Sequence, residues 1–299
     1  MAGAGRRFFK AGAVFLLLAA LGLAALFVLG YLFFPEDDGD LISFSTDHVA
    51  VVDVEGLISE SDTTIRRLRG YVKDPAVSAI VLRIDSPGGA VGPSQDIFRE
   101  VVKARAKKPV VASMGAVAAS GGYYIAAACS RIVAGPGAIT GSIGVILSLS
   151  NLEGLMDKIG LKPEVIKSGK FKDAGSPYRP MSEEERAFLQ GLVDNLYQQF
   201  VADVARERRM SVDAVRALAD GRVFTGTQAL EHKLVDELGN LQDAIRAAAR
   251  LGGIEGEPVV ERARHDGGLL WMLLGERVSA YLPERPMLKS GVYFLWPGW

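Results

Sequence analysis

The sequence predicts an α/β fold built on a parallel sheet. Three short apolar stretches, 48–54, 79–84 and 110–114, have the composition of buried strands. Two stretches in which apolar residues recur with helical spacing, 63–72 and 93–106, separate them. Alternation of this kind favours parallel strands joined by crossover helices. With 299 residues, of which 49% are hydrophobic, the chain can form one sizeable domain with appendages.

Weaker patterns follow in the middle of the chain. Residues 131–135 and 141–145 are further strand candidates, residues 153–159 a short helix and residues 163–167 another strand. Residues 168–177 are polar and contain two glycines, so we expect a flexible connection there.

A long helix is the clearest element of the second half. Ser182 and Glu185 form a capping box, and apolar residues follow with helical spacing as far as Val204. We interpret this apolar stripe as a packing surface. Shorter helices are expected at residues 212–219, 227–232 and 241–251.

The N-terminus has the features of a membrane anchor. Residues 11–34 carry no charge, and 24 residues of helix are about 36 Å long, enough to cross the hydrocarbon core of a bilayer. Three basic residues precede this run and four acidic residues follow it, which places residues 1–10 in the cytoplasm and the remainder outside. Residues 35–47 then form a linker. A cleavable signal peptide is the alternative, but its apolar part would be shorter, about 7–15 residues.

Charge and cysteine content exclude several other classes. The net charge is −1, which gives no indication of nucleic-acid binding. A single cysteine, Cys129, excludes an internal disulfide and argues against a cysteine-built zinc site. Its apolar neighbours indicate a buried small residue.

Ser120 stands in the most informative turn. The strand candidate 110–114 leads into a Gly/Ala-rich segment, and helical character resumes after Ser120-Gly-Gly. At a strand-to-helix turn a hydroxyl points outward, glycines let another backbone approach, and the helix N-terminus offers unpaired N–H groups. These are the surroundings of a nucleophile, although Ser-Gly-Gly is also typical of a simple helix N-cap.

A serine nucleophile needs a base, and the histidines are poor candidates. His48, His232 and His265 have no spacing that suggests a Ser-His-Asp triad or a metal motif. A lysine can take the hydroxyl proton when burial disfavours its ammonium form, and Ser-Lys pairs are a known variant of the triad. Residue patterns alone do not choose among Lys167, Lys170 and Lys172.

Five motifs, in order between about residues 49 and 251, resemble those of the signal peptide peptidase A family in its short, single-domain bacterial form. They are Asp85-Ser-Pro-Gly-Gly89, Met114-Gly-Ala-Val-Ala-Ala-Ser120-Gly-Gly-Tyr-Tyr124, Thr140-Gly-Ser142-Ile-Gly-Val145, Ser168-Gly-Lys170-Phe-Lys172-Asp173 and Gly221-Arg-Val-Phe-Thr-Gly226. One departure is Lys233, where the resemblance predicts glycine.

The resemblance implies a ClpP/crotonase-like domain, at residues 48–260, with a Ser-Lys dyad. It implies Ser120 as the nucleophile, Lys172 as the general base and Ser142 as the serine that orients the lysine. The oxyanion hole would use Gly88 or Gly89 together with the Gly121 amide.

The function that we expect is a membrane-anchored serine endopeptidase that degrades released signal peptides and other short apolar peptides. The resemblance implies no metal and no cofactor, a homo-oligomeric ring, and a single-pass protein of the inner membrane with its catalytic domain outside the cytoplasm. Short members of the family form closed rings, so Lys172 of one subunit could serve Ser120 of the next. The alternatives are a related stomatin-associated membrane serine protease and a non-proteolytic crotonase-like acyl-CoA enzyme or scaffold.

The C-terminal tail, residues 261–299, matches nothing in the family pattern. Two apolar and aromatic stretches, 269–274 and 292–296, are each too short to cross a bilayer. We expect the tail either to lie at a membrane interface, which its tryptophans favour, or to pack on its own domain or a neighbouring subunit.

Overall fold

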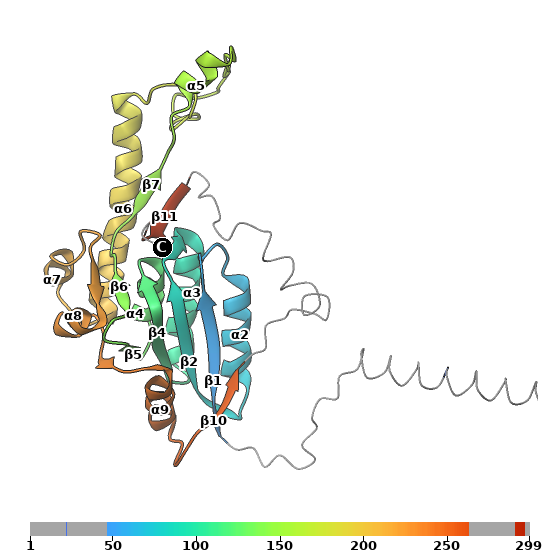
Figure 1. Ribbon diagram of the computed structural model, residues 1–299, viewed down its shortest axis with the longest axis vertical. Helices are drawn as coiled ribbons and strands as arrows, with labels where there is room; N and C mark the ends of the chain where they lie inside the picture. The colour runs from blue at the N-terminus through green and yellow to red at the C-terminus, as the bar shows by residue number, and fades with distance from the viewer. Residues whose placement is uncertain (1–21, 23–46, 263–290, 297–299) are drawn as a thin grey trace, which may run out of the picture. The chain divides into compact units, whose positions relative to one another are not determined.

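The computed structural model describes residue 22, residues 47–262 and residues 291–296. The chain divides into two units, Met1–Thr46 and Asp47–Trp299, and the labelled elements of Figure 1 belong to the second. The expected membrane span, residues 11–34, lies outside the described residues apart from Gly22. Within the described part of the chain, no helix is long and apolar enough to cross a membrane.

A large sheet forms the centre of the fold (Figure 1). Its strands are β1 (His48–Glu55), β2 (Val77–Ser86), β4 (Val110–Ala119), β5 (Arg131–Ala134), β6 (Ile139–Gly141), β8 (Val223–Thr225), β9 (Glu237–Leu238) and β10 (Val259–Arg262). The main path runs β10-β1-β2-β4-β5-β9 with every pair parallel. β6 extends β4 in parallel, and β8 pairs antiparallel with β6. The predicted parallel α/β class is confirmed.

Helices cover both faces of this sheet. They are α2 (Asp62–Lys73), α3 (Val91–Arg105), α4 (Gly121–Ala127), α5 (Glu153–Lys158), α6 (Glu183–Glu207), α7 (Val212–Arg216), α8 (Gly226–Glu231) and α9 (Leu241–Gly252). Alternate residues of β1 pack into hydrophobic cores on opposite faces of the sheet, because side chains of a strand point alternately to its two faces. Ala50 and Val52 pack into the core that α2, α3, α4 and α6 cover, whereas Val49 and Val51 face α9.

A second, three-stranded sheet lies beside the first. It contains β3 (Gly88–Ala90), β7 (Ile146–Ser148) and β11 (Gly291–Leu295), with β11 in the middle and antiparallel to both neighbours. Residues 291–296 of the tail therefore pack on their own domain, which was one of the two expectations.

Two predicted strands differ from the structure. Residues 163–167 form no strand, because no described segment pairs with them; Val165 and Ile166 are exposed. Of the strand expected at 141–145, only Gly141 lies in a strand, as the last residue of β6, and residues 142–145 connect it to β7. Gly141 and Ser142 have φ values of 82° and 50°, and two successive residues with positive φ end an extended strand.

The capping box of α6 is confirmed: Ser182 Oγ accepts from the Glu185 amide at 3.2 Å, and Glu185 accepts from the Ser182 amide at 2.9 Å. The apolar stripe is buried only in its second half, at residues such as Phe200 and Val204. In the first half Phe188 is 50% exposed. The first half of α6 and the segment before it extend beyond the sheets (Figure 1), and we call residues 149–192 the arm.

Lys233 stands just after α8 with a φ of 60°, in the left-handed region that favours glycine. A side chain costs about 1–2 kcal/mol in that region, whereas glycine loses about 0.5–1 kcal/mol more backbone entropy on folding. We therefore predict that Lys233→Gly raises the free energy of unfolding by up to about 1 kcal/mol in urea denaturation. Lys73→Gly, in the last turn of α2, is the control and should lower it; a decrease in both variants would contradict the prediction.

Candidate active site

Ser120 joins β4 to α4 in a strained conformation. Its φ of 52° and ψ of −114° are unusual for a residue with a side chain. Its amide donates to the Gly141 carbonyl at 2.8 Å, and its carbonyl accepts from the Tyr124 amide at 2.8 Å, so β6 and α4 hold the conformation on both sides. Nucleophilic serines of hydrolases occupy strained strand-to-helix turns of this kind.

The Ser120 hydroxyl has no partner among the described residues. The side chain is 1% exposed, and its Oγ accepts and donates no hydrogen bond there. Buried hydroxyls are normally hydrogen-bonded, and an orphan on a strained residue points to a chemical role.

Two backbone amides lie close to this serine. A Cβ built on Gly121 would be 3.2 Å from the nitrogen of Gly89, so the two residues are in close contact. The Gly88 amide donates to Ser86 Oγ at 3.1 Å, which leaves it engaged within the turn. The sequence left open whether Gly88 or Gly89 contributes to an oxyanion hole. The geometry favours the Gly89 amide as the partner of the Gly121 amide. One carbonyl oxygen could accept from both, as in an oxyanion hole.

The glycines of this turn are required by close backbone contacts. Gly88 has a φ of 104°, and a Cβ on it would lie 2.7 Å from the Gly121 nitrogen. A Cβ on Gly89 would lie 2.0 Å from the Ile58 carbonyl oxygen. Any side chain at either position would force the backbone apart.

Ser142 lies near Ser120, at the end of β6. It follows β6 directly, is 5% exposed, and its amide donates to the Arg222 carbonyl at 2.8 Å. Because Ser120 bonds to the carbonyl of the preceding Gly141, the two serines are held next to each other through one hydrogen bond. Ser120, Gly121, Gly88–Gly89 and Ser142 are thus brought together.

Lys172 is not brought to them within one chain. It lies in the turns between α5 and α6, on the arm, where its side chain is exposed. Ser120 Oγ has no described partner, so the Lys172 amine is outside hydrogen-bonding distance of it. The expected flexible connection is a series of turns, with the Lys172 amide donating to the Gly169 carbonyl at 3.2 Å.

The three lysines of this segment have different surroundings. The Lys167 amine is paired with Asp173, and the Lys170 amine with Glu184. The Lys172 amine has no hydrogen bond or ion pair with any residue that the structure describes. Lys167 and Lys170 are each held by a carboxylate, so Lys172 is the lysine least committed to a structural role.

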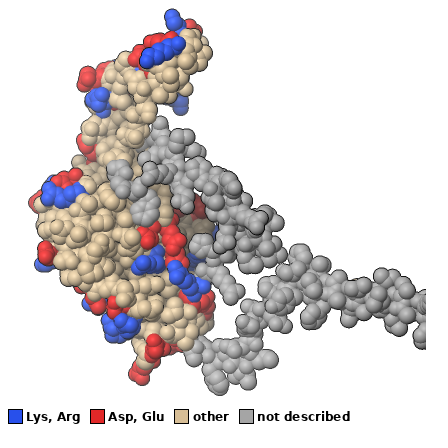
Figure 2. All heavy atoms as spheres, in the orientation of Figure 1, with Lys and Arg blue, Asp and Glu red and all other residues tan. Residues whose placement is uncertain are grey.

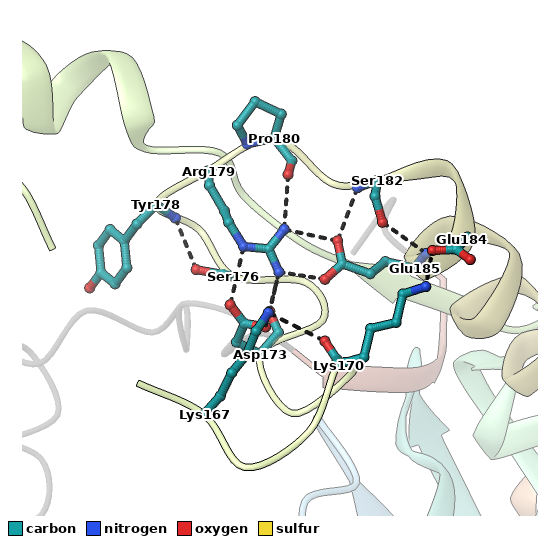
Figure 3. A network of polar contacts seen from close by, with 10 residues as sticks. All are labelled: Lys167, Lys170, Asp173, Ser176, Tyr178, Arg179, Pro180, Ser182, Glu184 and Glu185. Atoms are coloured by element: carbon teal, nitrogen blue, oxygen red, sulfur yellow. Dashed lines mark hydrogen bonds and ion pairs between the residues drawn. The ribbon is translucent and has the colours of Figure 1, made fainter. Parts of the chain in front are cut away.

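Arg179 connects the turn at Asp173 to the start of α6 (Figure 3). Its guanidinium donates to Asp173 at 3.1 Å and to Glu185, the capping residue of α6, at 2.9 Å. Hydrogen bonds from Arg179 lower the pKa of both carboxyls to about 2. The sequence revealed Glu185 as a cap but gave no sign of this clamp, since arginine–carboxylate pairs across a loop follow no periodic pattern.

The other candidate groups are unsuited to the chemistry. Burial raises the pKa of the Cys129 thiol to about 12, so it remains protonated, as expected for a buried residue. His48 pairs with Glu261 at 2.7 Å, and the His232 ring lies against Phe224. Neither of these histidines lies against Ser120 Oγ, and His265 lies outside the described residues.

Comparison with known proteins identifies relatives. Residues 102–255 match the sequence profile of peptidase family S49. A candidate protease of Synechocystis sp. is 46% identical over 71% of this chain and 76% of its own length. A candidate signal peptide peptidase SppA of Enterococcus faecium is 37% identical over 73% of this chain and 63% of its own, and Protease 4 of Salmonella typhi is 35% identical over 86% and 43%. The chain therefore spans less than two thirds of the latter two.

The Arg179 clamp predicts unusually acidic carboxyls. Because the pKa values of folded Asp173 and Glu185 lie below those of free side chains, about 3.9 and 4.3, the clamp stabilises the fold fully above those values and less as pH falls towards 2. Carboxyl ¹³C NMR should give midpoints of about 2, and Arg179→Ala should raise both. Arg216→Ala, which removes an exposed pair with Asp213, should change neither. Midpoints near 4 in the unaltered protein would contradict the clamp.

Gly88→Ala should disable the site. The added methyl group would lie 2.7 Å from the Gly121 nitrogen, and the φ of 104° is itself unfavourable for alanine. The Gly89 and Gly121 amides therefore cannot keep their positions. We expect labelling of Ser120 by a serine-directed fluorophosphonate to slow by about 10²–10³-fold, the usual effect of losing an oxyanion donor. Gly92→Ala, in α3 with open space around it, is the matched control. Equal labelling of both variants would count against this oxyanion hole.

Proposed function

The chain belongs to peptidase family S49, and from this membership we propose that it is a serine endopeptidase with Ser120 as its nucleophile. The observation that carries the proposal is the Ser120 hydroxyl, unpartnered on a strained turn beside the Gly89 and Gly121 amides. An acyl-CoA enzyme of related fold would need the amides but not this hydroxyl.

The reaction follows from these groups. Ser120 Oγ forms a bond to the carbonyl carbon of a peptide while its proton passes to a neutral lysine amine, and the two amides stabilise the negative oxygen. The carbon–nitrogen bond then breaks, and the lysine returns the proton to the leaving amine. Water hydrolyses the ester by the same steps and regenerates the hydroxyl.

Lys172 is our candidate for the base. It is the lysine of its segment whose amine is left without a described partner, whereas Lys167 and Lys170 are ion-paired. A basic lysine must also be shielded from water, and the exposed Lys172 is not shielded by its own chain. Ser142, held beside Ser120, would orient the amine.

A second copy of the chain would supply this shielding. We propose that the subunits form a closed ring in which Lys172 of one copy serves Ser120 of the next. The arm supports this arrangement, because it exposes large apolar side chains that a neighbouring subunit would bury, and on the face shown in Figure 2 an uncharged surface lies below the charged tip. These are Leu152, Leu155, Ile159, Leu161, Val165, Ile166, Phe171, Tyr178, Phe188 and Leu192.

Released signal peptides and other short apolar peptides are the proposed substrates. The name of the Enterococcus faecium relative supports this class. The uncharged run at residues 11–34 supports an anchor in the inner membrane, with the catalytic domain outside the cytoplasm.

Complementation tests the dyad and its formation between subunits. Ser120→Ala and Lys172→Ala should each abolish cleavage of a synthetic signal peptide, since nucleophile and base act as a unit. When the two inactive chains are co-expressed, up to about a quarter of the subunit boundaries should join an intact Ser120 to an intact Lys172 and recover activity.

Lys170→Ala is the matched control and should retain most of the activity, because that amine pairs with Glu184. If Lys170→Ala is inactive and Lys172→Ala is active, the base is misassigned. Mixed assemblies that are verified by tagged pull-down yet remain inactive would exclude a dyad formed between subunits.

A further inference from the structure

Asp85 begins the motif at residues 85–89 and lies near the end of β2, where it is partly buried. Its carboxylate accepts hydrogen bonds from two successive backbone amides of β4. Oδ1 accepts from Val117 at 3.1 Å, and Oδ2 accepts from Ala116 at 3.3 Å. Both amides lie shortly before Ser120, so the carboxylate contacts the strand that carries the proposed nucleophile.

The strand β4 contains a bulge at these two amides. Ile84 of β2 pairs with Met114 of β4, and the next pair is Ser86 with Ala118. Between these two pairs β2 has one residue, Asp85, whereas β4 has three, residues 115–117. The extra residues of a bulge are left without ladder partners, so their backbone groups need other ones.

Two side chains of β2 provide those partners. Arg83 and Asp85 lie on the same face of β2, because alternate residues of a strand share a face. The Arg83 guanidinium donates to the Met114 carbonyl at 2.9 Å, where the bulge begins, and Asp85 accepts from the amides that follow. Hydrogen bonds to ionised groups are roughly twice as strong as neutral ones, so these contacts hold the bulge firmly.

The bulge transfers β4 from one neighbouring strand to another. Before it, residues 111–113 pair with β5; after it begins, residues 117–119 pair with β6. The hydrogen bond from the Ser120 amide to the Gly141 carbonyl continues the pairing with β6. The position of Ser120 therefore depends on the shape of the bulge.

Close packing fixes the carboxylate under the bulge. A Cβ built on Gly115 would lie 2.5 Å from Cγ of Asp85, which is closer than two such atoms can approach. The absence of a side chain at position 115 is therefore what allows the carboxylate to reach the two amides.

We propose that Asp85 is a positioning residue for Ser120: its carboxylate holds the bulge of β4 in the shape that delivers Ser120 to β6 and to the Gly89 and Gly121 amides. The inference rests on the proposed function and extends it. Asp85 makes no hydrogen bond to Ser120 Oγ, which has no partner among the described residues, so it acts through the backbone of β4.

Kinetics of Asp85→Ala test this role. We expect kcat for a synthetic signal peptide to fall by about 10²-fold with little change in KM, because the serine is misplaced while the substrate contacts remain. Fluorophosphonate labelling of Ser120 should slow by a similar factor. Asp85→Asn keeps the shape of the side chain and one acceptor oxygen, so its kcat should fall by only about tenfold.

Asp53→Ala is the matched control. Asp53 lies on β1 in register with Arg83, and its carboxylate accepts from Arg262 of β10 at 3.0 Å. Its loss should lower the free energy of unfolding but change kcat by less than about twofold, because surface ion pairs of this kind serve only stability. An equal loss of kcat in Asp53→Ala and Asp85→Ala would overturn the positioning role.

Hydrogen exchange at the Ser120 amide tests the inference without catalysis. That amide is bonded to Gly141, and Asp85→Ala should speed its exchange by at least about tenfold, since the end of β4 would open more often. Asp53→Ala should leave it unchanged. Asp85→Asn guards against misfolding of the alanine variant: full kcat and unchanged exchange in Asp85→Asn would contradict the role of the carboxylate.

The outcomes separate this inference from the proposed function. Unchanged kcat, labelling and Ser120 exchange in Asp85→Ala would overturn the positioning role even if the unaltered protein cleaves peptides. Faster Ser120 exchange in Asp85→Ala but not in Asp53→Ala, with neither cleavage nor labelling by the unaltered protein, would support the positioning role and overturn the proposed peptidase.

Discussion

The hydrogen bond from the Ser120 amide to the Gly141 carbonyl is the contact on which the site depends. It joins the end of β4 to the end of β6 and holds Ser120 at positive φ, which β4 alone would not impose. From that point α4 begins, so the Gly121 amide faces Gly89 while Ser142 follows on the neighbouring strand. A single backbone contact thus sets the relative positions of Ser120, which we propose as the nucleophile, the two amides and Ser142.

The site is formed largely by main chain, and this explains its dependence on glycine. Around Gly88, Gly89 and Gly121 the chains approach too closely for any Cβ. Backbone donors held in place by the fold need no reorganisation when charge develops, which is the condition for effective electrostatic stabilisation.

Features that depend on residues close together in the sequence were predicted, whereas contacts between distant segments were not. The strand-helix alternation, the Ser182 capping box and the turn at Ser120 depend on neighbouring residues, and each was recovered. The strand expected at 163–167 failed because a strand also needs a partner. The pairing of β11 with β3 joins residues about two hundred positions apart. The Arg179 clamp and the distance of Lys172 from Ser120 likewise arise from how segments meet in three dimensions, which no spacing pattern encodes.

The position of Lys172 on the arm affects the activity of a newly synthesised subunit. Within the part of the chain that the structure describes, Lys172 does not reach Ser120, so on the proposed arrangement a solitary subunit would be inactive. Catalytic power would then appear only after subunits accumulate and close on one another, and it would disappear again on dilution. On that arrangement, the requirement for assembly would itself protect the cell from the enzyme while it is being made.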